Sequence, residues 1–132
     1  SNPCHNMLLL YNQQWEHLLL AFDDLRREKA VTVSVMEGDS VTLNADLTAV
    51  QKYLLIQWMF GSTRIAEADR LTQTNSTYAG PDERFRDRLK LDHQTGSLTI
   101  TNIRTTDSGL YKVTVISNET SYMRFNLTVY GE

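Results

Sequence analysis

Two aromatic residues, Trp58 and Tyr111, constrain the fold of this chain more than any other feature. Tyr111 lies in the segment DSGLYKV at residues 107–113, where the glycine permits a tight turn and Asp107 can accept hydrogen bonds from the turn's backbone. A tyrosine just after such a turn can return its hydroxyl to upstream main chain, an arrangement called a tyrosine corner. Trp58 lies in an apolar run that suits a buried strand. Together they predict a two-sheet β-sandwich.

Alternating apolar and polar residues supply the strands of this sandwich. Strands are expected at residues 31–35, 41–45, 53–60, 64–67, 88–91, 97–103, 110–115 and 125–130. In the third of these, Ile56, Trp58 and Phe60 should point inward. The polar stretch 69–81 is long enough for one additional edge strand. We therefore expect an all-β domain over residues 31–132.

Charge and cysteine content narrow the class of protein. The chain has 13 basic and 16 acidic residues, for a formal net charge of -3, so the basic surface expected of a nucleic-acid-binding protein is missing. Its one cysteine, Cys4, cannot form an internal disulfide and leaves the redox compartment open. No apolar run approaches the roughly 18 residues of a membrane span. A membrane anchor would therefore lie outside this sequence.

Residues 1–30 are expected to form a helical extension, separate from the β domain. Five apolar residues recur at alternating steps of four and three and predict an amphipathic helix over residues 6–29: Tyr11, Trp15, Leu18, Phe22 and Leu25. Such a face needs to be covered by its own domain, by a partner's groove or by a second copy in a homodimer. A membrane-surface role is less favoured, because the polar face is not enriched in Lys and Arg.

We expect no enzyme activity, no metal and no other cofactor. His5, His17 and His93 are scattered, without the spacing that a metal site needs. Ser108 follows an acidic residue, but no histidine base is placed beside it, and its position in a turn accounts for it. The mixed-charge run at residues 82–88 is interpreted as a solvated edge.

Three N-x-[ST] sequons, at Asn75, Asn118 and Asn126, bear on the cellular location. Any one of them could occur by chance. Three within about a hundred residues, two of them in expected loops, favour a secreted or cell-surface glycoprotein.

The order and spacing of these motifs resemble the variable-type immunoglobulin domain over residues 31–132. The matching stretches are GDSVTL at 38–43, Trp58, GSLTI at 96–100 and DSGLY at 107–111. The resemblance implies a V-type Greek-key sandwich. It also implies that an arginine at the start of the family's fourth strand pairs with Asp107, and Arg88 is preferred for this role over Arg84 or Arg86.

The family's core cysteines are replaced in this chain. In antibody-type domains a disulfide joins the two sheets beside the tryptophan, and the resemblance places Ala45 and Val113 at these positions. Such a bridge would stabilise the domain by about 4 kcal/mol, so core packing must substitute for it. Loss of both cysteines with Trp58 retained resembles the membrane-distal domain of the signalling lymphocyte activation molecule and lymphocyte adhesion receptors.

This resemblance implies a cell-surface receptor domain that binds another immunoglobulin-type domain, on self or on a different protein, through its GFCC′ sheet. The outward side chains expected on that sheet are Gln57, Met59, Arg64, Glu67, Lys112, Thr114 and Arg124. Mixed charges on a flat face favour fast, weak and specific binding. Each of these residues could instead be an ordinary solvated strand position. The strand alternation places Asn126 on the same face, where a glycan would cover part of the sheet. Either Asn126 carries no glycan, or the partner binds nearer the opposite end of the sheet.

Two other functions fit the same fold. One is an intracellular structural immunoglobulin domain of the cytoskeletal type, which also often lacks the disulfide. The other is an antigen-receptor-like variable domain, which pairs with a second variable domain through the same sheet. An additional edge strand within residues 69–80, or a glycan on Asn75 or Asn118, would favour the cell-surface receptor over the structural domain.

Overall fold

The computed structural model describes residues 30–131. The predicted helix at residues 6–29, its role in dimerisation, and Cys4 lie outside the described residues. The described elements are the strands β1 (Val31–Met36), β2 (Val41–Leu43), β3 (Leu55–Phe60), β4 (Thr63–Asp69), β5 (Thr74–Thr77), β6 (Leu89–Leu91), β7 (Leu98–Ile100), β8 (Gly109–Ile116) and β9 (Thr120–Tyr130), the short helix α2 (Leu47–Val50), and the 3-10 turns η1 (Pro81–Glu83) and η2 (Thr105–Asp107).

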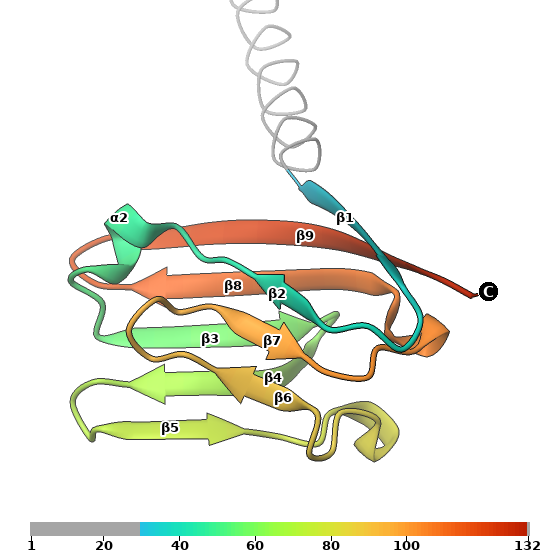
Figure 1. Ribbon diagram of the computed structural model, residues 1–132. Coiled ribbons are helices and arrows are strands. Elements are labelled where there is room, and N and C mark those ends of the chain that lie inside the picture. Colours follow the sequence, from blue (N-terminus) through green and yellow to red (C-terminus); the bar gives the residue numbers. More distant parts are fainter. Residues whose placement is uncertain (1–29, 132) are drawn as a thin grey trace, which may run out of the picture. The chain divides into compact units, whose positions relative to one another are not determined.

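These strands form two sheets that face one another (Figure 1). The larger sheet has six strands in the order β1-β9-β8-β3-β4-β5, and the smaller has three in the order β2-β7-β6. All neighbours are antiparallel except β1 and β9, which run parallel. This confirms the all-β, V-type sandwich. The additional edge strand is β5, within the stretch where the sequence left room for one.

Several strand ends differ from the sequence-based expectation. The predicted start of the last strand at Phe125 is wrong, because β9 begins at Thr120 and pairs with β8 along the whole hairpin. Conversely, β2 and β7 are shorter than expected, since each pairs only over a register of three residues. Strand length here depends on the partner strand as well as on local alternation.

Trp58 lies at the centre of the core and has no exposed surface. Its ring nitrogen donates a hydrogen bond to the carbonyl oxygen of Gly96 at 2.9 Å, and its ring lies 5.5 Å from that of Phe125. The residues at the two cysteine positions, Ala45 and Val113, are both buried. Val113 is the β8 partner of Trp58. Close aliphatic and aromatic packing therefore fills the region where related domains have a disulfide.

The turn before β7 requires a glycine. Gly96 has a φ of 73°, a conformation that side chains disfavour. A Cβ at this position would also lie 3.1 Å from side-chain atoms of Ile56 and Val50. The turn can thus pass close enough to the core to accept the hydrogen bond from Trp58.

A buried polar cluster closes one end of the sandwich, and we call Arg88, Asp107 and Tyr111 the corner network. The Arg88 guanidinium donates to both carboxylate oxygens of Asp107, at 2.8 and 3.0 Å. The Tyr111 hydroxyl donates to the main-chain oxygen of Asp107 at 2.6 Å, which forms the tyrosine corner. The hydrogen bond with Asp107 raises the pKa of Arg88, and burial raises the pKa of Tyr111.

The other two candidate arginines have different partners. Arg84 donates to the main-chain oxygen of Thr106 at 2.9 Å, and its guanidinium lies over the Phe60 ring. Arg86 forms a solvent-exposed ion pair with Glu83 at 3.5 Å. Arg88 is therefore the arginine that pairs with Asp107.

Candidate functional site

The seven side chains predicted on the binding face all lie on the outward side of the six-stranded sheet. The strand register arranges them, together with Tyr122, in two rows that run across β4, β3, β8 and β9. The first row contains Glu67, Gln57, Thr114 and Tyr122, and the second contains Arg64, Met59, Lys112 and Arg124. We call these eight residues the outward face. Whether they bind a partner stays a prediction.

A β-bulge brings Arg64 and Glu67 to the same side of β4. Strict alternation would place residues three apart on opposite faces of a strand. The register between β3 and β4 shifts between Trp58 and Met59, so that Met59 pairs with Arg64 while Trp58 pairs with Ala66. The extra residue of the bulge, Ile65, is fully buried. The bulge thus places the positively charged Arg64 on the outward face, on the same side as Glu67.

On the β4 side of the outward face, Glu67 is the centre of a hydrogen-bonded group. Its carboxylate accepts bonds from Arg64 at 3.1 Å, from Gln57 at 3.3 Å and from the Tyr78 hydroxyl at 3.3 Å. The Arg64 guanidinium also lies 5.4 Å from the centre of the Tyr78 ring. The charges on this side largely neutralise one another.

The β8 and β9 side of the outward face is basic and less constrained. The Lys112 ammonium lies 4.5 Å from the centre of the Tyr122 ring, a cation–π contact, and 59% of Tyr122 is exposed. Arg124 lies directly opposite Lys112 in the register of β8 and β9. Its side chain forms no hydrogen bond or ion pair within residues 30–131. This side of the outward face therefore combines two cations with one exposed aromatic ring.

Tyr122 is the outward-face residue that the sequence analysis missed. The last strand was expected to begin at Phe125, so no side was assigned to residues before it except Arg124. The signal was present in the alternation, because Met123 and Phe125 both point inward and leave Tyr122 on the side of Arg124.

The three sequons lie in different settings. Asn126 is exposed on the outward side of β9 and pairs with Leu110, beside the row that contains Lys112. Asn118 is exposed in the turn between β8 and β9. Asn75 lies in the edge strand β5 and not in a loop, and its side-chain nitrogen donates to the carbonyl oxygen of Leu91 at 3.2 Å.

Within residues 30–131, no three His, Cys, Asp or Glu side chains are close enough together to hold a metal ion. The Ser108 hydroxyl oxygen accepts a hydrogen bond from the main-chain nitrogen of Val129 at 2.9 Å, which gives it a structural role. His93 lies in the turn between β6 and β7. In the same part of the chain, no helix is long and apolar enough to cross a membrane.

Residues 28–130 match the family of the immunoglobulin V-set domain. The match covers most of the chain, which therefore belongs to this family. In the strand letters of that family, β3, β4, β8 and β9 are C, C′, F and G, so the outward face is the GFCC′ face. No curated protein sequence was found to match the chain.

Solved structures of other immunoglobulin domains share the fold. The first immunoglobulin-like domain of human CD48 antigen is 23% identical, with a TM-score of 0.64, and the match covers 77% of this chain and 83% of that one. CD84, of the SLAM family, is 21% identical, with a TM-score of 0.63 and coverage of 78% and 99%. The voltage-gated sodium channel β4 subunit, whose extracellular domains form parallel homodimers with a role in cell–cell adhesion, is 16% identical, with a TM-score of 0.58 and coverage of 79% and 93%. These likenesses confirm that the chain resembles SLAM-family V-type domains in fold.

Proposed function

We propose that this chain is the recognition domain of a cell-surface adhesion or immune receptor, and that it binds another immunoglobulin-type domain through its GFCC′ face. One observation carries the proposal. The buried charges of Arg88 and Asp107 are paired with each other, whereas Lys112 and Arg124 lie on a partly exposed sheet face beside the exposed ring of Tyr122. Arginine and tyrosine are favoured at protein interfaces because they combine apolar contact area with hydrogen bonding.

The charge distribution defines the chemistry of the partner. The β8 and β9 side of the face is basic, so the partner should present carboxylates opposite Lys112 and Arg124. Glu67 lies on the opposite side of the same face. A second copy of this chain related by a twofold axis could place its Glu67 near these cations, because a twofold interface brings one patch against itself. The proposal therefore includes self-binding as well as binding to a different receptor.

The sequons support a cell-surface location and limit the contact area. A glycan on Asn126 would cover the end of the sheet near Leu110, one row beyond Lys112. The contact would then be centred on the row that contains Gln57 and Tyr122.

Strand β5 (Thr74–Thr77) favours this function over an intracellular structural domain, because structural domains of the cytoskeletal type usually lack this edge strand. An antigen-receptor-like domain would use the same sheet to pair with a second variable domain. That alternative predicts a stable heterodimer, whereas adhesion predicts weak binding between cells.

Charge reversal tests the proposal. Lys112→Glu and Arg124→Glu should each reduce binding at least tenfold. Binding is measured with beads that carry the glycosylated domain, against a panel of cells for a different receptor and against beads with the same domain for self-binding. Lys90→Glu is the matched control, because Lys90 is an exposed lysine on β6 of the other sheet. Circular dichroism should show that all three variants are folded. Full adhesion by both outward-face variants would show that the assignment of the face is wrong.

A further inference from the structure

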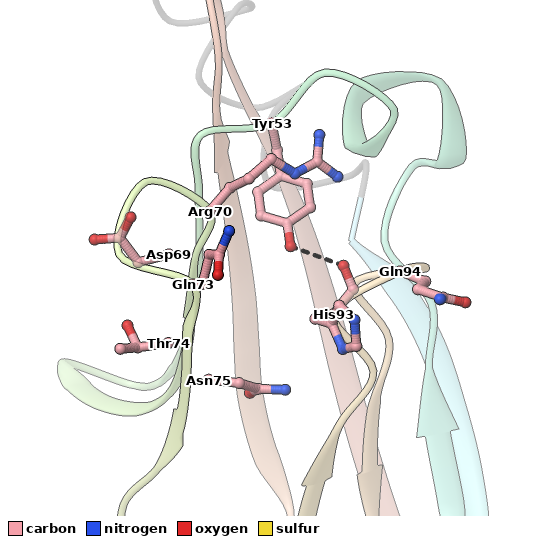
Figure 2. A pocket seen from close by; sticks show the side chains of 8 residues that line it. All are labelled: Tyr53, Asp69, Arg70, Gln73, Thr74, Asn75, His93 and Gln94. Carbon is pink, nitrogen blue, oxygen red and sulfur yellow. Dashed lines mark hydrogen bonds between the residues drawn. The ribbon is translucent and has the colours of Figure 1, made fainter.

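A pocket of about 560 Å³ lies at the edge of the domain, beside Asn75 (Figure 2). Three segments far apart in the sequence form its walls: the residues before β3, the turn between β4 and β5, and the turn between β6 and β7. Its volume is within the roughly 300–1,000 Å³ of ordinary ligand sites. The predicted binding face does not include this pocket.

Polar and charged residues line the pocket, and hydrogen bonds hold two of them, Tyr53 and Arg70. The Tyr53 hydroxyl donates to the main-chain oxygen of His93 at 2.8 Å, which ties two of the three segments together (Figure 2). The Arg70 guanidinium lies 4.2 Å from the centre of the Tyr53 ring, and it donates to the main-chain oxygen of Gln51 at 3.4 Å. Gln73 adds an amide from the β4–β5 turn. Donors and acceptors around a pocket of this size suit a ligand that is rich in hydroxyl and amide groups.

Asn75 is placed at one side of this pocket by its strand. It is directly opposite Ala68 on β4, so the two side chains lie on the same side of the sheet. In Figure 2 the Asn75 amide points toward the His93 side, whereas Asp69 and Thr74 point the other way. The hydrogen bond to Leu91 uses one N–H of Nδ2 and leaves the other free of any partner within residues 30–131. Because β5 is the edge of its sheet, no strand among residues 30–131 hydrogen-bonds to the outer side of its backbone.

We propose that Asn75 carries an N-linked glycan and that its first sugar, an N-acetylglucosamine, lies in this pocket. The inference rests on the proposed cell-surface function, since the secretory pathway supplies the lipid pyrophosphate-linked oligosaccharide donor. In the transfer, Nδ2 of Asn75 bonds to C1 of the sugar, the lipid pyrophosphate leaves with the electron pair of the broken C1–O bond, and the displaced Nδ2 proton passes to a base. The remaining N–H can keep the bond to Leu91, and the sugar's hydroxyl and acetamido groups face the polar walls.

Site occupancy is the first test. The whole chain is secreted from mammalian cells, its glycans are removed by peptide N-glycosidase in ¹⁸O-labelled water, and the labelled sites are identified by mass spectrometry. Asn75 should be occupied, Thr77→Ser should retain the glycan, and Thr77→Ala should lose it. If Asn118 is occupied and Asn75 is empty, this inference fails while the cell-surface function stands. If no sequon is occupied, both fail.

The position of the sugar is the second test. From the folded protein, the glycosidase should release the glycan of Asn75 at least tenfold more slowly than the glycan of Asn118, which lies in an exposed turn. After denaturation the two rates should be equal. His93→Ala keeps the main-chain oxygen that binds Tyr53, so the fold should persist, and it should speed release at Asn75 alone. Equal release rates from the folded wild-type protein would show that the glycan extends into solvent and would overturn the proposal.

Discussion

Arg88 and Arg124 carry the same charge in the same domain, but their surroundings differ. Arg88 is 7% exposed and forms a two-bond ion pair with Asp107, which has no exposed surface. Arg124 is half-buried on the outward face and has no polar partner within the described part of the chain. A buried charge is tolerated only when it is paired. The corner network therefore serves the fold, whereas Arg124 carries a charge that no described residue pairs, which suits the binding role proposed for the outward face.

Removal of Arg88 should have the largest effect on stability. Arg88→Ala leaves the Asp107 carboxylate buried without its partner and should lower the free energy of unfolding by about 3–5 kcal/mol. Chemical denaturation measures this change. Arg86→Ala is the matched control, because Arg86 lies two positions away in an exposed ion pair, and its loss should change stability by less than about 1 kcal/mol. Similar losses in the two variants would mean that the corner network is no more important than a surface pair.

A disulfide between the two sheets should have the next largest effect, in the stabilising direction. Ala45→Cys combined with Val113→Cys, in a Cys4→Ser background, should form a bridge under oxidising conditions. It should raise the free energy of unfolding by about 2–4 kcal/mol, because it restricts the unfolded chain. Thiol titration and thermal melting with and without reductant measure the bridge and its effect. Because both positions are buried in the core, the bridge should leave binding by the outward face unchanged. Free thiols after oxidation would show that the two positions do not face each other.

Loss of the Tyr111 hydroxyl should have a smaller effect. Tyr111→Phe removes the hydrogen bond to the main-chain oxygen of Asp107 and should lower stability by about 1–3 kcal/mol. Burial raises the pKa of Tyr111 above its usual value near 10. Above about pH 10 the unfolded state therefore releases this proton first, and the wild-type domain should lose stability as the pH rises. Tyr111→Phe should show a shallower loss between about pH 10 and 11, and an identical slope would contradict this assignment.

Truncation on the outward face should have the smallest effect on stability. Tyr122→Ala removes a ring that is mostly exposed, so stability should change by less than about 0.5 kcal/mol. Binding should weaken by about tenfold, because exposed aromatic rings often anchor interfaces. Tyr130→Ala provides the control, since Tyr130 is also about half exposed on β9 but lies outside the two rows. Equal loss of binding in the two variants would remove the distinction between the outward face and the rest of the strand.

Local chemistry made much of the fold predictable. The alternation around Trp58 predicted a buried strand, and the DSGLY segment predicted the turn and the hydroxyl bond of Tyr111. Both depend on residues that are close in sequence, through the period-two geometry of strands and the turn preference of glycine. The outward positions on β8 followed from the same alternation.

The candidate site was less predictable, because it depends on pairing between distant segments. The strand that carries Tyr122 was predicted to begin later than it does. Its first residues form a strand because they pair with β8, which local alternation does not specify. Arg64 and Glu67 share a side only because of a bulge in the pairing of β3 with β4. The pocket beside Asn75 combines segments that the sequence separates widely.

By itself, the sequence determined which residues must be buried and where the chain must turn, because hydrophobic periodicity and turn chemistry act over a few neighbouring residues. Only the tertiary structure decided the strand ends, the bulge in β4 and the pocket at the edge. Hydrogen bonds between strands and contacts between loops depend on partners that local patterns do not specify.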